Sequence, residues 1–137
     1  MANDAGALLR ASGDDPRTFL ADIASKIEGF LYQCQNNPDW TMIRLTSGFD
    51  RVFGHNAAAF IRGRHSFAAL IHPEDLPDVT HKVEEAIARD LNWSLRYRMR
   101  NAQGVYVPVY ESGGAVRHPT TREVMHLDGV ILEAKAA

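Results

Sequence analysis

The chain has 137 residues, 45% of them hydrophobic and 23% charged. This composition is typical of one globular domain that can bury a core without disulfide bonds or structural metal ions. A formal net charge of −2 gives no electrostatic footprint for nucleic acid or for an anionic membrane surface. The single cysteine, Cys34, excludes an intrachain disulfide and favours a reducing compartment.

The N-terminal part predicts a flexible segment followed by a helix. Residues 1–14 are mostly small and polar, which favours a segment without fixed structure. A helix is expected over 15–28, because Asp15 is a preferred N-cap residue, Pro16 suits the first helical position and Gly29 would end the helix. Its apolar side chains recur at helical spacing and form one stripe: Phe19, Leu20, Ile23 and Ile27.

A β-hairpin and a group of short helices are predicted next. Residues 30–34 and 40–45 flank the turn-forming sequence NNPD and are expected to form the two strands of the hairpin. Ser47 lies three residues before Asp50, as in a capping box, and Gly54 would end the helix that they start. Two further helical pieces are expected, over 57–61 and 67–71.

A longer helix and a strand follow. Asp75 is a suitable N-cap for this helix, and Pro77 is tolerated in its first turn. The buried stripe of the helix comprises Val79, Val83, Ala86 and Ile87, and His81 faces water. The strand over 93–100 alternates between an apolar face and a face with three arginines. The apolar face comprises Trp93, Leu95, Tyr97 and Met99, and the arginines are Arg96, Arg98 and Arg100.

The last third of the chain is expected to be mostly strand. A turn at 101–104 leads to a strand over 105–110, and residues 127–132 form the final strand. Gly113-Gly114 and His118-Pro119 would mark loops. The order of helix, two strands, several helices and three strands predicts an α+β domain, with an antiparallel sheet that carries helices on one face.

Four motifs in this order resemble the PAS/PAC sensor family, over about residues 27–134. YQCQNNPDW at 32–40 resembles the first hairpin of the PAS-fold subgroup that has an HPED element, and residues 47–54 are similar to its next helix. HPED itself stands at 72–75, and YRMR with a following glycine at 97–104 resembles the strand-turn signature. Together the four motifs are far more specific than any one of them.

The resemblance implies a five-stranded sheet in the order 2-1-5-4-3, with the sensor domain over 29–134. It also implies a sensory or regulatory domain of a signalling protein, such as a two-component histidine kinase, a diguanylate cyclase or phosphodiesterase, or a transcription regulator. Such a domain senses a small ligand or binds a protein, acts on an effector in cis or a partner in trans, and is not itself an enzyme. Pro108 stands where Trp is usual, which would cause a bulge or a lost hydrogen bond.

Apolar and aromatic side chains from several elements are expected to line a ligand pocket or to fill a core, because the same residues serve both purposes. They are Phe53, Phe60, Val79, Val83, Trp93, Leu95, Tyr97 and Met99. A ligand there would be a small, largely apolar or aromatic organic molecule. No cofactor is predicted, with haem or flavin as the alternatives. Flavin-binding relatives carry a reactive cysteine where this chain has Ser66, and His65 is the histidine that could reach a pocket.

Two other functions stay open at this point: a stand-alone interaction protein, and a small isomerase- or dehydratase-like enzyme on a cone-shaped α+β fold. The enzyme would need an ionisable side chain that points from the sheet into the pocket. The apolar face of 93–100 has none, so His126 and Asp128 could serve only if their face of the last strand turned inwards. We expect the HPED carboxylates to stabilise a helix N-terminus and the three arginines to face solvent or a partner. No catalytic or metal-binding residue is predicted.

The apolar stripe of the N-terminal helix predicts a homodimer. An isolated helix gains little stability unless its stripe is covered, and helices from two chains could pack together and over the sheets. No segment approaches the roughly 20 apolar residues of a membrane span, and the N-terminus lacks the pattern of a secretory leader. We therefore expect a cytoplasmic protein without a nucleic-acid or membrane partner.

Overall fold

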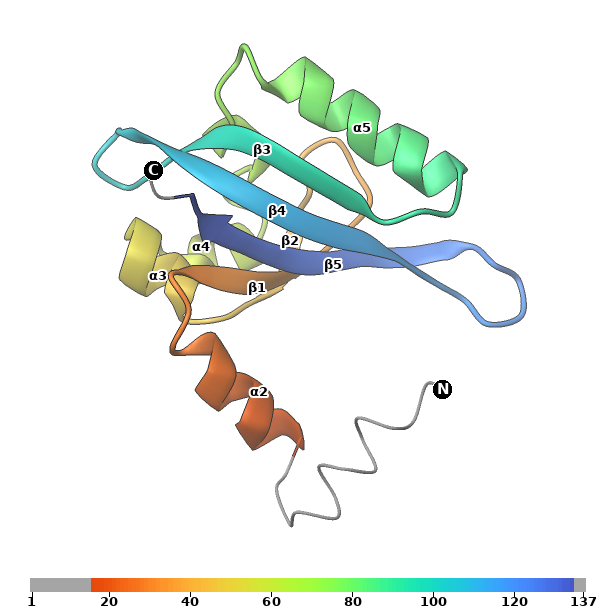
Figure 1. Cartoon of the computed structure of the whole chain (residues 1–137), viewed down its shortest axis with the longest axis horizontal. Coiled ribbons are helices and arrows are strands. Elements are labelled where there is room, and N and C mark those ends of the chain that lie inside the picture. Colours follow the sequence, from red (N-terminus) through yellow and green to blue (C-terminus); the bar gives the residue numbers. More distant parts are fainter. Residues whose placement is uncertain (1–15, 135–137) are drawn as a thin grey trace.

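The computed structural model describes residues 16–134, so the segment expected to be flexible, 1–14, lies outside the described residues. The strands are β1 (Gly29–Cys34), β2 (Met42–Leu45), β3 (Trp93–Arg100), β4 (Tyr106–Arg117) and β5 (Val124–Glu133). The helices are α2 (Pro16–Ala24), α3 (Gly48–Phe53), α4 (Ala57–Ile61) and α5 (Leu76–Ala88), with a short 3-10 helix η1 (Ala68–Leu70). The antiparallel sheet has the order β2-β1-β5-β4-β3, which confirms the predicted architecture (Figure 1).

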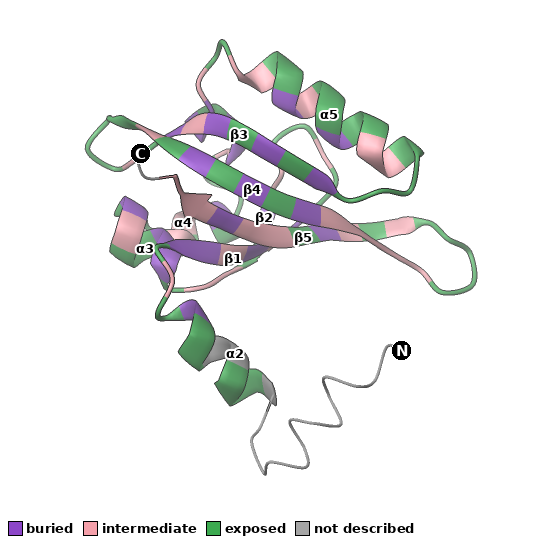
Figure 2. Cartoon of the chain, in the orientation of Figure 1, coloured by how far each residue is buried: buried purple, intermediate pink, exposed green. Residues whose placement is uncertain are grey.

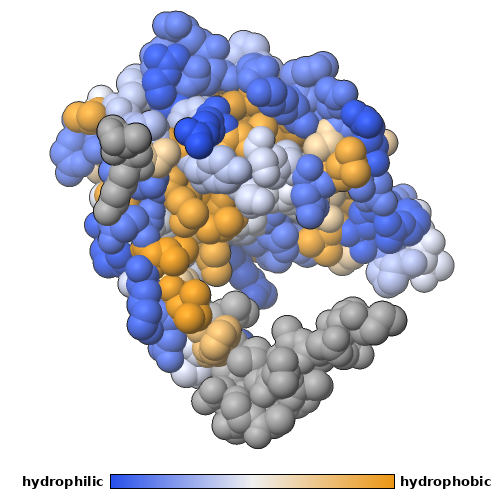
Figure 3. Space-filling view, in the orientation of Figure 1, coloured by the Kyte–Doolittle hydropathy of each residue, from blue (hydrophilic) through white to orange (hydrophobic). Residues whose placement is uncertain are grey.

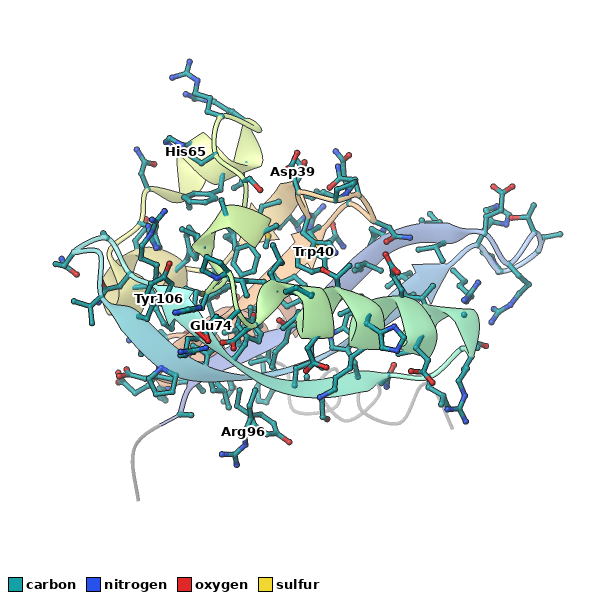
Figure 4. All side chains as sticks on the ribbon, turned by 90° about the horizontal axis from the view of Figure 1, so that it is seen from above. Asp39, Trp40, His65, Glu74, Arg96 and Tyr106 are labelled. Atoms are coloured by element: carbon teal, nitrogen blue, oxygen red, sulfur yellow. The ribbon has the colours of Figure 1, made fainter. Side chains whose placement is uncertain are left out.

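The helices α3, α4 and α5 cover one face of the sheet, and the core lies between the two layers. Figure 4 shows Trp40 on the helix side of the sheet and Arg96 on the opposite side. Along β3, buried and more exposed residues alternate as the sequence predicts (Figure 2). Phe30 of β1 packs edge-on against Phe49 and Phe53 of α3, with ring centroids 5.0 and 5.5 Å apart. None of the helices within residues 16–134 is long and apolar enough to cross a membrane.

The HPED segment leads into α5 and also closes the free edge of β3. Edge strands leave backbone groups unpaired, and here His72 N–H donates to the Arg98 carbonyl at 2.9 Å. The Asp75 carboxylate accepts the Arg98 N–H at 2.9 Å and the guanidinium at 3.0 and 2.8 Å. Hydrogen bonds from Arg98 hold the pKa of Asp75 below its ordinary value. Asp75 is the N-cap residue of α5, as predicted, but its side chain makes no cap hydrogen bond because it is bound to Arg98. Arg98 is therefore ion-paired rather than simply solvated.

Two other local predictions also differ from the structure. Helix α2 ends at Ala24, earlier than the expected residue 28, and Gly29 begins β1 instead of ending the helix. A Cβ on Gly29 would lie 2.1 Å from the Ile131 carbonyl oxygen, so close pairing with β5 explains this glycine. The capping box does not form, because Ser47 makes no side-chain cap and Asp50 accepts a hydrogen bond from the Ala57 N–H.

Strand β4 is longer than expected. Pro108 pairs with Arg98 without a register shift, so of the two predicted effects, a bulge or a lost hydrogen bond, the bulge does not form. Its missing N–H falls at the end of the β4–β5 ladder, whose last pair joins Val109 to Glu133, and its carbonyl accepts from Ala134. Gly113-Gly114, predicted to be a loop, lies within β4.

The centre of the sheet contains one cross-strand row with two glycines. Trp93 of β3 pairs with Gly113 of β4, which pairs with Gly129 of β5, which pairs with Tyr32 of β1. A Cβ on Gly113 would lie 2.6 Å from the Tyr32 hydroxyl and 2.8 Å from the Trp93 indole nitrogen. The two large side chains can therefore fold inwards over the sheet only because the two middle positions have no side chain.

We predict that Gly113→Ala destabilises the protein by about 1–3 kcal/mol, the cost of forcing extra volume into a packed interior. Chemical denaturation of the purified variant measures this loss. Ser112→Ala, at the exposed neighbouring position of β4, is the control and should change the unfolding free energy by less than about 0.5 kcal/mol. Equal stability of the two variants would contradict the close-packing argument.

Candidate functional site

Glu111 is the buried charged residue among those that the structure describes, and it lies on the inner face of β4. Three neutral groups donate hydrogen bonds to its carboxylate. Oε2 accepts the Tyr32 hydroxyl and the Trp93 indole N–H, both at 2.7 Å, and Oε1 accepts the Tyr97 hydroxyl at 2.6 Å. The carboxylate is thus held by β1 and β3 from either side of its own strand.

The glycine row explains how these donors reach one carboxylate. Tyr32 starts on β1, two strands away from β4, and its ring reaches across β5 where Gly129 lies. Trp93 reaches from the other side across Gly113, and Tyr97 follows four residues later on the same inward face of β3. The alternation of the strands and the absence of side chains at Gly113 and Gly129 thus let all three donors reach one carboxylate.

Burial dominates the electrostatics of this cluster. It raises the pKa of Glu111 above its ordinary value, an effect that the hydrogen bonds from Tyr97, Trp93 and Tyr32 oppose. Burial also raises the pKa values of both tyrosines well above 10.0, so both remain protonated donors. Within residues 16–134 no basic side chain pairs with Glu111. A buried carboxyl group without a counter-charge is costly, and such groups gather at functional sites.

A small cavity lies beside Glu111, between the sheet and the helices. It has a volume of about 20 Å³, enough for about one water molecule. The sheet contributes Tyr32, Cys34, Met42, Trp93, Glu111 and Leu127, and the opposite wall consists of Trp40, Phe67, Ile71, Val79 and Val83. Burial raises the pKa of the Cys34 thiol to about 12, so this thiol stays protonated and unreactive.

Trp40 forms a partly exposed wall of the cavity. Its backbone has a φ of 47°, in the left-handed region that a bulky residue rarely adopts. Its N–H donates to the Asn37 carbonyl at 3.0 Å, and the Asn37 side-chain oxygen accepts from the Thr41 N–H at 3.0 Å. Backbone strain of this kind persists where the surrounding structure enforces it, often at ligand-binding sites.

The structure brings only some of the predicted pocket residues to this cavity. Val79, Val83 and Trp93 line it. Four others are buried in the core outside the lining: Phe53, Leu95, Tyr97 and Met99. Phe60 borders a separate open hollow together with His55 and His65. That these residues bind a ligand stays a prediction.

Sequence reasoning missed Glu111, Tyr32 and Trp40. Glu111 follows Val107 and Val109 at the spacing of an inward face, so the signal was present, but the predicted strand ended at Tyr110. The alternative face of β5 does not turn inwards, because His126 bonds to Gln33 while Leu127 is buried. Glu111 thus supplies the inward ionisable group that the enzyme alternative required. Its hydrogen-bonded partners are all donors to it, however, which suits binding better than proton transfer.

The cofactor candidates lie away from the cavity. His81 is 74% exposed and contacts Glu85 on the outside of α5. His65 is exposed, and its ring contacts Phe60. The Ser66 hydroxyl accepts from the Ala69 N–H at 3.4 Å. In the described part of the chain, no cluster of three His, Cys, Asp or Glu could hold a metal ion.

A second surface lies on the outer side of the sheet and on α2. Figure 3 shows apolar side chains gathered from the C-terminal end of β5 down to α2. The outer apolar band, as we name it, comprises half-buried Leu31, Val130 and Leu132 and exposed Phe19 and Ile23. Of the other two residues predicted to form the dimer stripe, Ile27 lies beyond the end of α2 and the Leu20 side chain is outside the described ones.

Comparison with known proteins identifies the fold. A family model described as "PAS fold" matches residues 42–131. The PAS domain of a protein from Colwellia psychrerythraea is similar, with a TM-score of 0.71 and 14% identity over 88% of this chain and 98% of that one. No curated protein matches the chain.

Two further solved structures share this fold at similarly low identity. The N-terminal domain of a diguanylate cyclase with PAS/PAC sensor from Marinobacter aquaeolei has a TM-score of 0.63 and 17% identity over 77% of this chain and 94% of that one. Cycle PAS-B from Drosophila melanogaster with bound ethylene glycol has a TM-score of 0.66 and 15% identity, and the match covers 77% and 99% of the two chains.

Two substitutions at Glu111 should separate the hydrogen bonds from the charge. Glu111→Leu leaves three buried donors without a partner, each of which costs about 1–3 kcal/mol, so we expect a large loss of unfolding free energy. Glu111→Gln keeps a carbonyl oxygen for Tyr32 and Trp93, and its NH₂ can donate to the Tyr97 hydroxyl oxygen, so it should lose much less. Equal losses in denaturant titrations would contradict the donor cluster.

The raised pKa of Glu111 can be tested by comparing the stability of the wild type and of Glu111→Gln as the pH changes. Because the pKa of Glu111 is raised above 4.5, the folded protein keeps this proton after the unfolded chain has released it. The associated stability is complete below pH 4.5 and is lost as the pH rises through the raised pKa. The stability of the wild type relative to Glu111→Gln should therefore fall with rising pH, and a constant difference would contradict the raised pKa.

Proposed function

Since the chain belongs to the PAS-fold family, we propose that it is a sensory domain whose state is set by a small molecule in the cavity beside Glu111. The observation that carries this proposal is the buried carboxylate with its three donors, at a cavity walled by α5 and the sheet. A structural core could be filled by apolar residues at lower cost, because a buried carboxyl group loses its hydration. The cluster is therefore better explained by recognition than by stability.

The signal would pass to an effector domain in cis or to a protein partner in trans. Among similar folds, one belongs to a diguanylate cyclase with a PAS/PAC sensor. A histidine kinase, a cyclase or phosphodiesterase, or a transcription regulator is the class of effector that we propose. The domain itself is proposed to have no enzymatic activity and no resident haem or flavin, because the histidines near the expected positions are exposed and Ser66 replaces the reactive cysteine.

We further propose that the domain forms a homodimer through the outer apolar band. Phe19 and Ile23 are 40% and 47% exposed on α2, beside the half-buried apolar residues on the outer face of β1 and β5. Contiguous apolar surface of this kind favours a partner of similar character. The isologous contact of two identical bands would cover the stripe on both chains.

The sensory proposal predicts that the purified protein either retains or takes up a small organic molecule. Native mass spectrometry detects a retained compound, and the absorbance spectrum identifies haem or flavin. A compound that binds the folded state raises the melting temperature by an amount that grows with the logarithm of the ligand excess. An empty cavity that no small molecule stabilises would contradict the ligand-sensing proposal, and a haem or flavin spectrum would contradict the proposed lack of these cofactors.

The dimer proposal predicts that Ile23→Asp weakens self-association. A charge at the centre of an apolar interface must be desolvated, so the dimer dissociation constant should rise by at least about tenfold. Sedimentation equilibrium measures the constant. Leu91→Asp, at a similarly exposed apolar position between α5 and β3, is the matched control and should leave it unchanged. A wild-type monomer at high micromolar concentration would contradict the proposal.

A further inference from the structure

The hydrogen-bond donors around Glu111 are already engaged. The Tyr32 hydroxyl, the Trp93 indole N–H and the Tyr97 hydroxyl each have one hydrogen to donate, and each donates it to this carboxylate. Because the two phenol pKa values are raised by burial, neither hydroxyl loses that hydrogen. A ligand in the cavity therefore finds none of these three donors free.

Acceptor sites, in contrast, remain at the same place. A carboxylate can accept about four hydrogen bonds, and Glu111 accepts three. The Tyr32 oxygen, which also lines the cavity, keeps a lone pair while it donates. The remaining polar groups of the lining are the weakly donating thiol of Cys34 and two indole N–H groups, of which that of Trp93 is engaged and that of Trp40 belongs to the partly exposed wall.

The charge and the shape of the cavity also favour a small ligand that carries no negative charge. No cation offsets Glu111 within residues 16–134, so an ammonium group would supply the missing positive charge, whereas a second carboxylate would be repelled. The rest of the lining is apolar and includes Met42, Val79, Val83 and Leu127. The cavity of about 20 Å³ holds about one water molecule, so a ligand with a short apolar body enters only when the partly exposed wall formed by Trp40 moves outwards.

We propose that this cavity selects a small ligand that donates a hydrogen bond to Glu111, through an ammonium or hydroxyl group on a short apolar body, and that it rejects carboxylates. The inference rests on the proposed sensory function, since it names the class of molecule that the sensory cavity takes. Glu111 is then the specificity-determining residue of the site, with Tyr32, Trp93 and Tyr97 as positioning residues that fix the direction of its free lone pair.

A panel of four compounds with similar branched bodies tests this selection. Isobutylamine and isobutanol donate hydrogen bonds, 3-methyl-2-butanone only accepts them, and isobutyrate is an anion. Titrations followed by the NMR resonance of the Trp93 indole N–H report binding at the cluster itself. We expect the amine and the alcohol to shift this resonance, and the ketone and isobutyrate to bind at least about tenfold more weakly.

Glu111→Gln provides the second arm, because it keeps the shape of the side chain and removes its charge. Its NH₂ group adds a donor, so the preference for the amine over the ketone should fall by at least about tenfold. If the ketone or isobutyrate binds the wild type as tightly as the amine, the selection is wrong while the sensory function stands. If none of the four binds and native mass spectrometry finds no retained compound, both proposals are overturned.

Discussion

The carboxylate of Glu111 is the interaction on which the interior of this domain depends. It joins β1, β3 and β4 through three hydrogen bonds and has no counter-charge among the described residues. Burying a carboxylate costs several kcal/mol, and a hydrogen bond to a charged group contributes about 1.5–3 kcal/mol. The burial is therefore tolerated only while all three donors are in place. This requirement fixes the positions of two tyrosines and one tryptophan on the inner face of the sheet.

The same requirement explains why the interior has a cavity. Tyr32 and Trp93 can reach Glu111 only across Gly129 and Gly113, and these two positions contribute no side chain to the core. The large side chains pack against the sheet, and space remains between them and α5. The edge of the sheet is closed separately by Asp75 and Arg98, whose ion pair lies outside this cluster. The residues that close the edge of the sheet are thus different from those that surround the cavity.

Much of the fold could be predicted from the sequence, because the alternation along β3 and the order of the four motifs are local or nearly local signals. The site could not be predicted from the sequence, and the reason is the Gly113-Gly114 pair. Consecutive glycines usually indicate a loop, and that interpretation ended β4 one residue before Glu111. Only the cross-strand partners Trp93 and Gly129 show that Gly113 is required by close packing in a strand. The partner of the Asp75 side chain could not be predicted either, since Arg98 is distant in sequence.

The arrangement of β1 also suggests how binding of a ligand in the cavity could change the outer face of the sheet. Tyr32 and Leu31 are neighbours on β1, and the first points to Glu111 while the second lies on the outer apolar band. A ligand that donates to Glu111 adds a fourth hydrogen bond to the carboxylate that Tyr32 also contacts, and would thereby change the energy of holding β1 in its present position. A ligand shifts an equilibrium only by its differential affinity for the two states. The coupling between the cavity and the outer apolar band would therefore be as large as the preference of the ligand for one placement of Tyr32, with β1 as the strand that joins the two.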